Sequence, residues 1–124
     1  MSGQKRKIVI VDDEAHIIRV LKLKLTNAGY EVVCASNGLE AAEIIESEIP
    51  DVVISDINMP KLNGKELYFR TVPLKKEKNF LSIIMTCSLA KEDRGWIPSG
   101  DRIEFIEKPF SPKEILKIIE QAGI

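Results

Sequence analysis

The segment DVVISDINMP, Asp51–Pro60, places a carboxylate at the end of a short apolar run. The run itself, Val52–Ser55, is rich in β-branched residues, which is typical of a strand buried in a sheet. Asp56 follows directly, and a proline closes the segment. The position of this acid, at the tip of the most apolar strand, has to be explained.

Segments of strand and helix character alternate on both sides of this stretch. Apolar runs typical of buried strands lie at 7–13, 30–36, 52–56, 80–87 and 102–108. Helical periodicity is found at 15–29, 38–48 and 64–71, and a last helix begins at Ser111. Five strands that alternate with helices predict an α/β fold, a parallel sheet with helices on both faces.

Capping and breaking residues set the expected bounds of the helices. Gly29 is expected to end the first helix, and Asn37 to cap the second. Pro73 is expected to stop the third helix, whereas the pair Ser111-Pro112 supplies a cap and a first-turn proline for the last one. A proline and glycines interrupt the stretch Ser88–Asp101, so its helix, the fourth in chain order, is expected to be short or irregular.

Length and charge favour one ordinary globular domain. The 124 residues are 44% hydrophobic, enough for a single core, and we expect one domain over residues 1–124. Lysines and arginines number 18 against 19 acids, a balance that predicts neither a nucleic-acid nor a membrane surface. The basic clusters Lys5–Lys7 and Lys75–Lys78 are expected to be solvated charge.

The apolar segments and the cysteines predict a cytoplasmic location. No apolar run approaches the roughly 18 residues of a membrane span, and the N-terminus lacks the apolar core of a signal peptide. Cys34 and Cys87 both lie inside apolar runs, which indicates buried free thiols in a reducing compartment.

Polar residues gather where the expected strands end. These residues are Asp12, Asp13, Asp56, Thr86 and Lys108. Each has an ordinary structural explanation by itself, but the carboxyl ends of parallel strands meet at one edge, where ligands bind in such sheets. Three neighbouring acids call for a cation, and an all-oxygen ligand set suits Mg²⁺.

The remaining groups at this edge suit a phosphoryl group. Thr86 can donate a hydrogen bond and Lys108 supplies a positive charge, both useful where negative charge spreads over phosphate oxygens. The carboxylate of Asp56 can attack phosphorus and form an aspartyl phosphate. The set therefore predicts a phosphoryl acceptor.

Four motifs carry a resemblance to a known family. They are VDDE at Val11–Glu14, SDINMPKLNG at Ser55–Gly64, MTC at Met85–Cys87 and EKPF at Glu107–Phe110. In this order, and at strand ends, they resemble the receiver domain of response regulators in two-component signalling. The resemblance covers nearly the whole chain and implies a flavodoxin-like fold of the chemotaxis-regulator kind, with strand order 2-1-3-4-5.

The resemblance implies a role for each acid of the site. Asp56 would be the phosphorylated residue and also a metal ligand, and Asp13 would bind Mg²⁺ directly. Asp12 would act largely through metal-bound water, and the main-chain carbonyl of Asn58 would complete the site.

The resemblance also implies how the signal leaves the site. Thr86 and Lys108 would bind the phosphoryl oxygens, and the peptide bond before Pro109 would be cis. Phe105 stands where the family carries its switch aromatic, often a tyrosine, and Cys87 stands where alanine or glycine is usual. Phe105 would instead be a fixed core residue if the 95–100 stretch packed over it.

Three functions from different classes are compatible with these residues. The first is a switch that takes phosphate from a histidine kinase or phosphotransfer protein, and whose target binds the face formed by the 88–101 segment, the fifth strand and the last helix. It would not be an enzyme beyond its own phosphorylation and autodephosphorylation. The second is a pseudo-receiver that binds partners without taking phosphate. The third, an aspartate-nucleophile phosphohydrolase, is disfavoured because Asn58 replaces its general acid.

Overall fold

The computed structural model describes residues 5–59, 61–89, 95–96 and 102–124. Five parallel strands form one sheet in the order β2-β1-β3-β4-β5, the order that the resemblance implies. The strands are β1 (Lys7–Val11), β2 (Glu31–Ala35), β3 (Val52–Asp56), β4 (Leu81–Thr86) and β5 (Ile103–Glu107). Each strand lies within the apolar run that predicted it. Most of the observed strands are shorter than predicted by one or two residues at an end.

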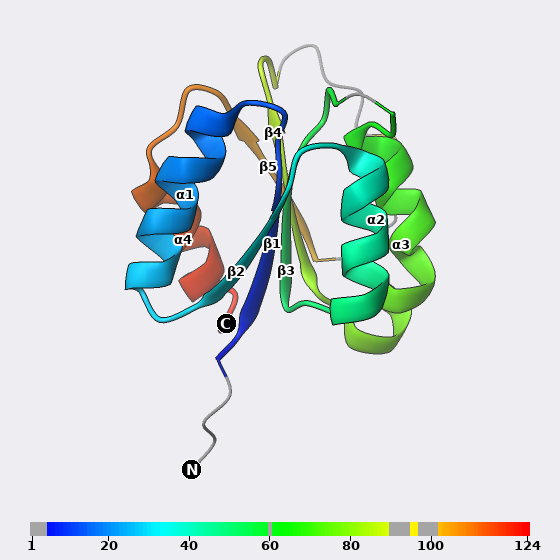
Figure 1. Ribbon diagram of the computed structural model, residues 1–124, viewed down its shortest axis with the longest axis horizontal. Coiled ribbons are helices and arrows are strands. Elements are labelled where there is room, and N and C mark those ends of the chain that lie inside the picture. Colours follow the sequence, from blue (N-terminus) through cyan, green and yellow to red (C-terminus); the bar gives the residue numbers. More distant parts are fainter. Residues whose placement is uncertain (1–4, 60, 90–94, 97–101) are drawn as a thin grey trace.

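In the part of the chain that the structure describes, four helices cover this sheet in two layers. They are α1 (Ala15–Asn27), α2 (Gly38–Glu48), α3 (Gly64–Lys78) and α4 (Pro112–Gln121). The pair α1 and α4 lies on one face and the pair α2 and α3 on the other (Figure 1). Among the described residues, no helix has the length and apolar character that crossing a membrane requires.

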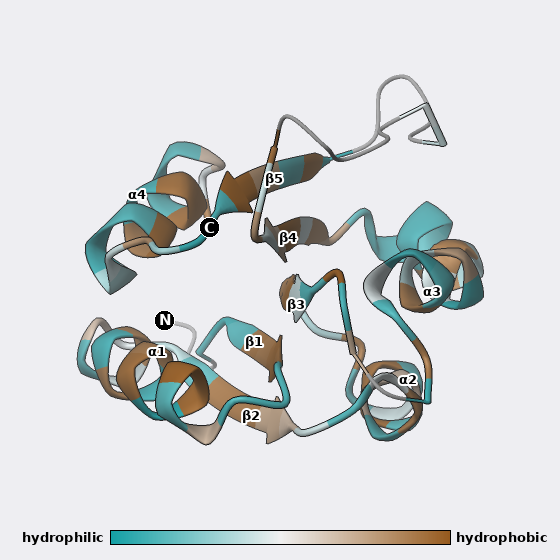
Figure 2. Ribbon diagram, turned by 90° about the horizontal axis from the view of Figure 1, so that it is seen from above, coloured by the Kyte–Doolittle hydropathy of each residue, from teal (hydrophilic) through white to brown (hydrophobic). Residues whose placement is uncertain are grey.

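Alternation along the strands divides the core into two clusters. Ile54 of β3 packs on the side of α1 and α4, together with Leu21 and Ile115. Val53, the neighbour of Ile54, packs on the side of α2 and α3 with Ile45. Both clusters join residues of the strands to residues of the helices, and Figure 2 shows the hydrophobic stretches, in brown, in the strands and on the helices of both layers. All five residues of β3 are buried, as the apolar run predicted.

The expected caps are present at the helix ends. The Asn37 side chain accepts a hydrogen bond from the Glu40 N–H and begins α2. Ser111 forms a capping box with Glu114 at the start of α4, with a proline in the first turn. Gly29 follows α1 with φ of 102°, a conformation that favours glycine.

The prediction that Pro73 stops the third helix was wrong. Helix α3 continues through Pro73 to Lys78 and ends at Asn79, which has the left-handed conformation. A proline removes the hydrogen bond to the carbonyl four residues earlier, here that of Phe69. Both residues lie on the exposed side of the helix, where water can satisfy that carbonyl. Leu74 then packs against the core of this layer and holds the next turn in place.

The prediction that Lys75 is solvated was also wrong. Lys75 is only 4% exposed, and its ammonium group donates to the carbonyl oxygens of Phe80 and Arg102. The rings of Tyr68 and Phe80 lie 5.9 and 5.0 Å from the same ammonium. Lys75 therefore ties the end of α3 to the segments that enter β4 and β5.

The two cysteines are free, as expected, but only one is even partly buried. Cys34 on β2 is half-buried, and burial raises the pKa of its thiol. Cys87 is exposed, contrary to expectation, because β4 ends one residue before it. The expected irregular element at 88–101 falls mainly outside the described residues.

Candidate functional site

The acids of the site meet at the carboxyl end of the sheet, the upper edge in Figure 1. The register pairs Val11 of β1 with Ser55 of β3, so the next residues, Asp12 and Asp56, are neighbours. One carboxylate oxygen from each of Asp12, Asp13 and Asp56 lies within 4.8 Å of the other two. The structure thus shows the convergence that the strand ends predicted.

Lys108 reaches into this acidic cluster from the end of β5. Its Nζ atom lies 3.1 Å from Oδ2 of Asp12 and 3.0 Å from Oδ2 of Asp56. The same atom lies 3.1 Å from Oε1 of Glu14. Sequence reasoning did not assign a role to Glu14, although it is the third acid of the VDDE motif and follows the acid pair directly.

Burial and pairing act in opposite directions on these groups. Asp12 is fully buried, and this desolvation raises the pKa of its carboxyl group, although the Glu14 N–H and Lys108 partly offset the effect. Burial lowers the pKa of Lys108, but its hydrogen bonds to Asp56, Asp12 and Glu14 outweigh this effect and raise the pKa well above its usual value. Lys108 therefore remains a cation at this site.

A glycine holds the loop that follows β3 against the strand end. The Gly64 N–H donates to the Ile57 carbonyl at 2.9 Å. A Cβ atom on Gly64 would lie 2.7 Å from the Asp56 carbonyl oxygen, closer than real side chains come. Asn58 in this loop is exposed, and its N–H donates to Oδ1 of Asp56 at 3.1 Å. The role expected of the Asn58 carbonyl stays a prediction.

A second glycine restrains the same loop from another element. Gly38 begins α2, and a Cβ atom there would overlap the backbone carbonyl of Leu62. The loop can take this path only because residue 38 has no side chain. Sequence reasoning included Gly64 in the motif that follows Asp56 but gave it no role, and it did not single out Gly38, since the role of each depends on a contact that no local pattern encodes.

Thr86 lies where it was expected, as the last residue of β4, and it is buried. Its hydroxyl group accepts a hydrogen bond from the Ser88 N–H at 3.3 Å. The Thr86 carbonyl accepts from the Lys108 N–H at 2.7 Å, which couples the ends of β4 and β5. The peptide bond between Lys108 and Pro109 is cis, as the resemblance implied.

Phe105 lies in the middle of β5, opposite Ile84 of β4, and is half-buried. The ring of Trp96 packs against it, with 6.1 Å between the ring centroids. Part of the 95–100 stretch thus packs over Phe105. This is the arrangement that the sequence analysis associated with a fixed Phe105 ring. The switch role of Phe105 stays a prediction.

A groove opens beside the acidic cluster, between α1 and the loop that joins β5 to α4. Its volume is about 560 Å³, and Glu14 and Lys108 line the end next to the site. Ile17 of α1 and Phe110 of the loop give it an apolar wall. The groove is large enough to accept side chains of another molecule next to the carboxylates.

Comparison with known families decides the identity of this arrangement. The sequence model described as the response regulator receiver domain matches residues 8–120. The chain belongs to this family. The receiver thus has the two-component signalling role that the four motifs implied.

Individual relatives agree with this assignment. The receiver is 44% identical over 117 residues to the "Probable transcriptional regulator ycf27" of Porphyra purpurea, covering 93% of this chain and 46% of that protein. It is 31% identical over 114 residues to an uncharacterized 14.6 kDa protein of Leptolyngbya boryana, covering 92% of this chain and 87% of that protein. The receiver therefore spans about half the length of the ycf27 relatives, and the activities of those longer proteins are not assigned to it.

Solved structures show the same fold. The chemotaxis response regulator CheY4 of Vibrio cholerae superimposes with a TM-score of 0.81 and 30% sequence identity, covering 95% of this chain and 98% of that one. The flavodoxin-like fold of the chemotaxis regulators, implied by the motifs, is thereby confirmed.

Proposed function

We propose that this receiver accepts one phosphoryl group on Asp56 in a Mg²⁺-dependent reaction and that the phosphorylated form binds a target protein differently. The observation that carries the proposal is the imbalance of charge at the site. Carboxylate oxygens of Asp12, Asp13 and Asp56 lie within 4.8 Å of one another, and one lysine, Lys108, is paired with two of them. Such a cluster is suited to a further cation.

The donor set fits Mg²⁺. Carboxylate and carbonyl oxygens are the ligands that this ion prefers, and it commonly keeps several waters alongside one or two carboxylates. We assign Asp13 and Asp56 as direct ligands, Asp12 as a ligand through water, and the Asn58 carbonyl as the remaining protein oxygen. When bound, the ion would offset negative charge between the carboxylates and the phosphoryl oxygens.

Transfer requires the following steps from the residues of this chain. A carboxylate oxygen of Asp56 forms a bond to phosphorus as the bond from phosphorus to the donor's leaving group breaks, which yields an acyl phosphate. The Lys108 ammonium, 3.0 Å from Asp56 in the resting state, is placed to pair with a phosphoryl oxygen. Thr86 ends the neighbouring strand β4 and would supply a hydroxyl donor to another phosphoryl oxygen.

The phosphodonor that we propose is a histidine kinase or a phosphotransfer protein. The groove between α1 and the β5–α4 loop supports this, because it combines an apolar wall with direct access to Lys108. The face formed by β5, α4 and the 88–101 segment is proposed for the target protein. We propose a cytoplasmic switch that is not an enzyme beyond its own phosphorylation and autodephosphorylation, with no direct role for nucleic acid or membrane.

Intact-mass measurement tests the proposal. The wild-type protein is incubated with acetyl phosphate, with and without Mg²⁺, and should gain one base-labile phosphoryl group only when Mg²⁺ is present. Asp56→Asn should gain none. Asp51→Asn is the matched control, since Asp51 precedes the same strand, and it should be modified as the wild type is.

Two outcomes would contradict the proposal. Modification of Asp56→Asn would place the acceptor elsewhere. A wild-type protein that stays unmodified with acetyl phosphate and with purified histidine kinases would favour the pseudo-receiver, a module that binds partners without taking phosphate.

A further inference from the structure

Four aromatic rings form a continuous chain from β5 to α3. The ring of Trp96 lies 6.1 Å from that of Phe105 on β5. On its other side, the Trp96 ring lies 5.2 Å from Tyr68 and 5.6 Å from Phe69, both on α3. Separations of this size, with tilted or edge-on rings, are favourable aromatic contacts. Trp96 is therefore the ring that joins the expected switch residue to a helix outside the proposed target face.

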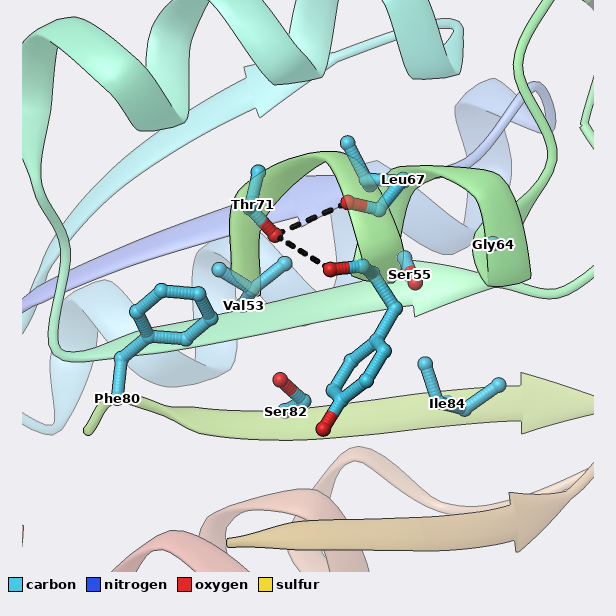
Figure 3. Close-up of a pocket in the computed structure, with 9 residues that line it drawn as sticks. Val53, Ser55, Gly64, Leu67, Thr71, Phe80, Ser82 and Ile84 are labelled. Atoms are coloured by element: carbon cyan, nitrogen blue, oxygen red, sulfur yellow. Dashed lines mark hydrogen bonds between the residues drawn. The ribbon is translucent and has the colours of Figure 1, made fainter. Parts of the chain in front are cut away.

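A small cavity lies between the sheet and α3, next to these four aromatic rings. Ser55, Ile84 and Phe105 form one row across β3, β4 and β5. A cavity of about 10 Å³ lies between the sheet and α3, and Tyr68 borders it together with Ser55, Ser82 and Ile84. Figure 3 shows the small side chains of Ser55 and Ser82 on its sheet side. Space of this size can hold about one water molecule.

The free space affects how easily these aromatic rings can move. A tightly packed ring can shift only if its neighbours give way, whereas a ring beside a void loses few contacts on a small displacement. Tyr68 is such a ring, although it is only 3% exposed to solvent. Phe69, the next residue, is 47% exposed, so a shift of α3 at this point changes the molecular surface.

We infer that Trp96 is a positioning residue that transmits the packing of Phe105 to Tyr68 and Phe69, so that phosphorylation also alters the α3 surface. The inference rests on the proposed phosphorylation of Asp56. Rotation or displacement of the Phe105 ring changes the packing around the Trp96 ring, because the two are in contact. The competing explanation is that Trp96 is a fixed cover that keeps Phe105 in one position.

The single tryptophan of the chain makes the first test specific. Intrinsic fluorescence excited at the indole reports on Trp96 alone, since the sequence has one tryptophan. Emission is recorded with Mg²⁺ before and after acetyl phosphate, and intact mass is measured on the same samples. We expect the emission maximum and intensity to change in proportion to the phosphorylated fraction. Asp56→Asn should show no change under the same conditions.

The second test separates transmission from static packing. In Phe105→Leu, which keeps an apolar side chain but removes the ring, phosphorylation should persist and the emission change should be lost. In Trp96→Leu, phosphorylation-induced shifts of the Tyr68 and Phe69 amides should disappear from NMR spectra, whereas those of the Asp56 loop remain. Trp96→Phe retains a ring and should restore the α3 shifts. Thermal unfolding of each variant shows whether it is folded.

The outcomes distinguish this inference from the proposed function. A wild-type protein that gains no phosphoryl group overturns both. A fully phosphorylated protein with unchanged Trp96 emission overturns the inference alone. So do α3 shifts that persist in a folded Trp96→Leu variant, because α3 would then respond by another route.

Discussion

Strand β3 carries an aspartate at each end, and the surroundings of these two acids are opposite in charge. Asp51, just before the strand, accepts a hydrogen bond from the Lys7 N–H at 2.7 Å. Its carboxylate also lies 3.8 Å from Arg6 and 3.4 Å from Lys78. At this end of the strand, one acid has two cations, and its charge is fully balanced without any added ion.

The other end of β3 has acids in excess. Asp56 shares Lys108 with Asp12, and Asp13 adds a third carboxylate to the cluster. An aspartate at a strand end is therefore not by itself a sign of a site, since Asp51 has a structural role. The distinguishing feature is the number of acids for each cation. Within the part of the chain that the structure describes, the carboxylates that could hold a metal ion gather at the carboxyl end of the sheet, whereas Asp51 is paired with cations.

The largest effect is expected from removing the cation at each end in turn. Lys108→Met should lower the free energy of unfolding by about 3 kcal/mol without Mg²⁺, because buried carboxylates lose their partner. Lys78→Met, which removes the exposed partner of Asp51, should cost less than about 1 kcal/mol. Urea unfolding measures both. Mg²⁺ should reduce the loss in Lys108→Met only, and equal losses in the two variants would contradict the comparison.

Removing an acid from each end of β3 should produce a difference in Mg²⁺ affinity that is nearly as large. Asp13→Ala should weaken Mg²⁺ binding about 100-fold, at least as much as loss of an outer-shell partner does in metal sites. Asp51→Ala should leave the affinity unchanged, since Asp51 is at the opposite edge of the sheet. Isothermal titration calorimetry measures both constants. Similar losses in the two variants would show that Mg²⁺ responds to net charge and not to a specific site.

Lys75 extends the comparison to the strands beside β3. Its ammonium group binds the carbonyls of Phe80 and Arg102, just before β4 and β5, so cations also hold this part of the N-terminal edge. Lys75→Met should lower the free energy of unfolding by about 2 kcal/mol, because buried carbonyls lose a charged donor. Lys76→Met, on the exposed side, should change it by less than about 0.5 kcal/mol. If thermal unfolding shows no difference between the two variants, the buried Lys75 does not stabilise this edge of the sheet.

The smallest effect on the site is expected from a residue that touches none of its acids. Gly38→Ala would push the Leu62 backbone and with it the loop that carries Asn58, so Mg²⁺ affinity should fall several-fold. Gly29→Ala is the control: it has open space but a positive φ, and it should cost about 1 kcal/mol of stability without changing Mg²⁺ affinity. Unchanged Mg²⁺ affinity in a folded Gly38→Ala protein would show that contacts other than the one between Gly38 and Leu62 position the loop.

Much of the fold and of the site could be predicted from sequence alone. The strand of Val52–Ser55 follows from a local pattern, and the caps at Asn37 and Ser111 follow from side-chain chemistry over three residues. The grouping of Asp12 with Asp56 was predictable because a parallel sheet brings the carboxyl ends of all its strands to one edge. Such features depend on neighbours in the chain or on the topology as a whole.

Only the tertiary structure decided the features that depend on contacts between particular distant residues. Pro73 lies inside a helix and Lys75 is buried, because packing of α3 outweighs the local preference of either residue. Glu14 meets Lys108, and Trp96 covers Phe105, through pairings that no local pattern encodes. The physical reason is that burial and ion pairing are set by the elements that surround a side chain, and these come from parts of the chain remote in sequence.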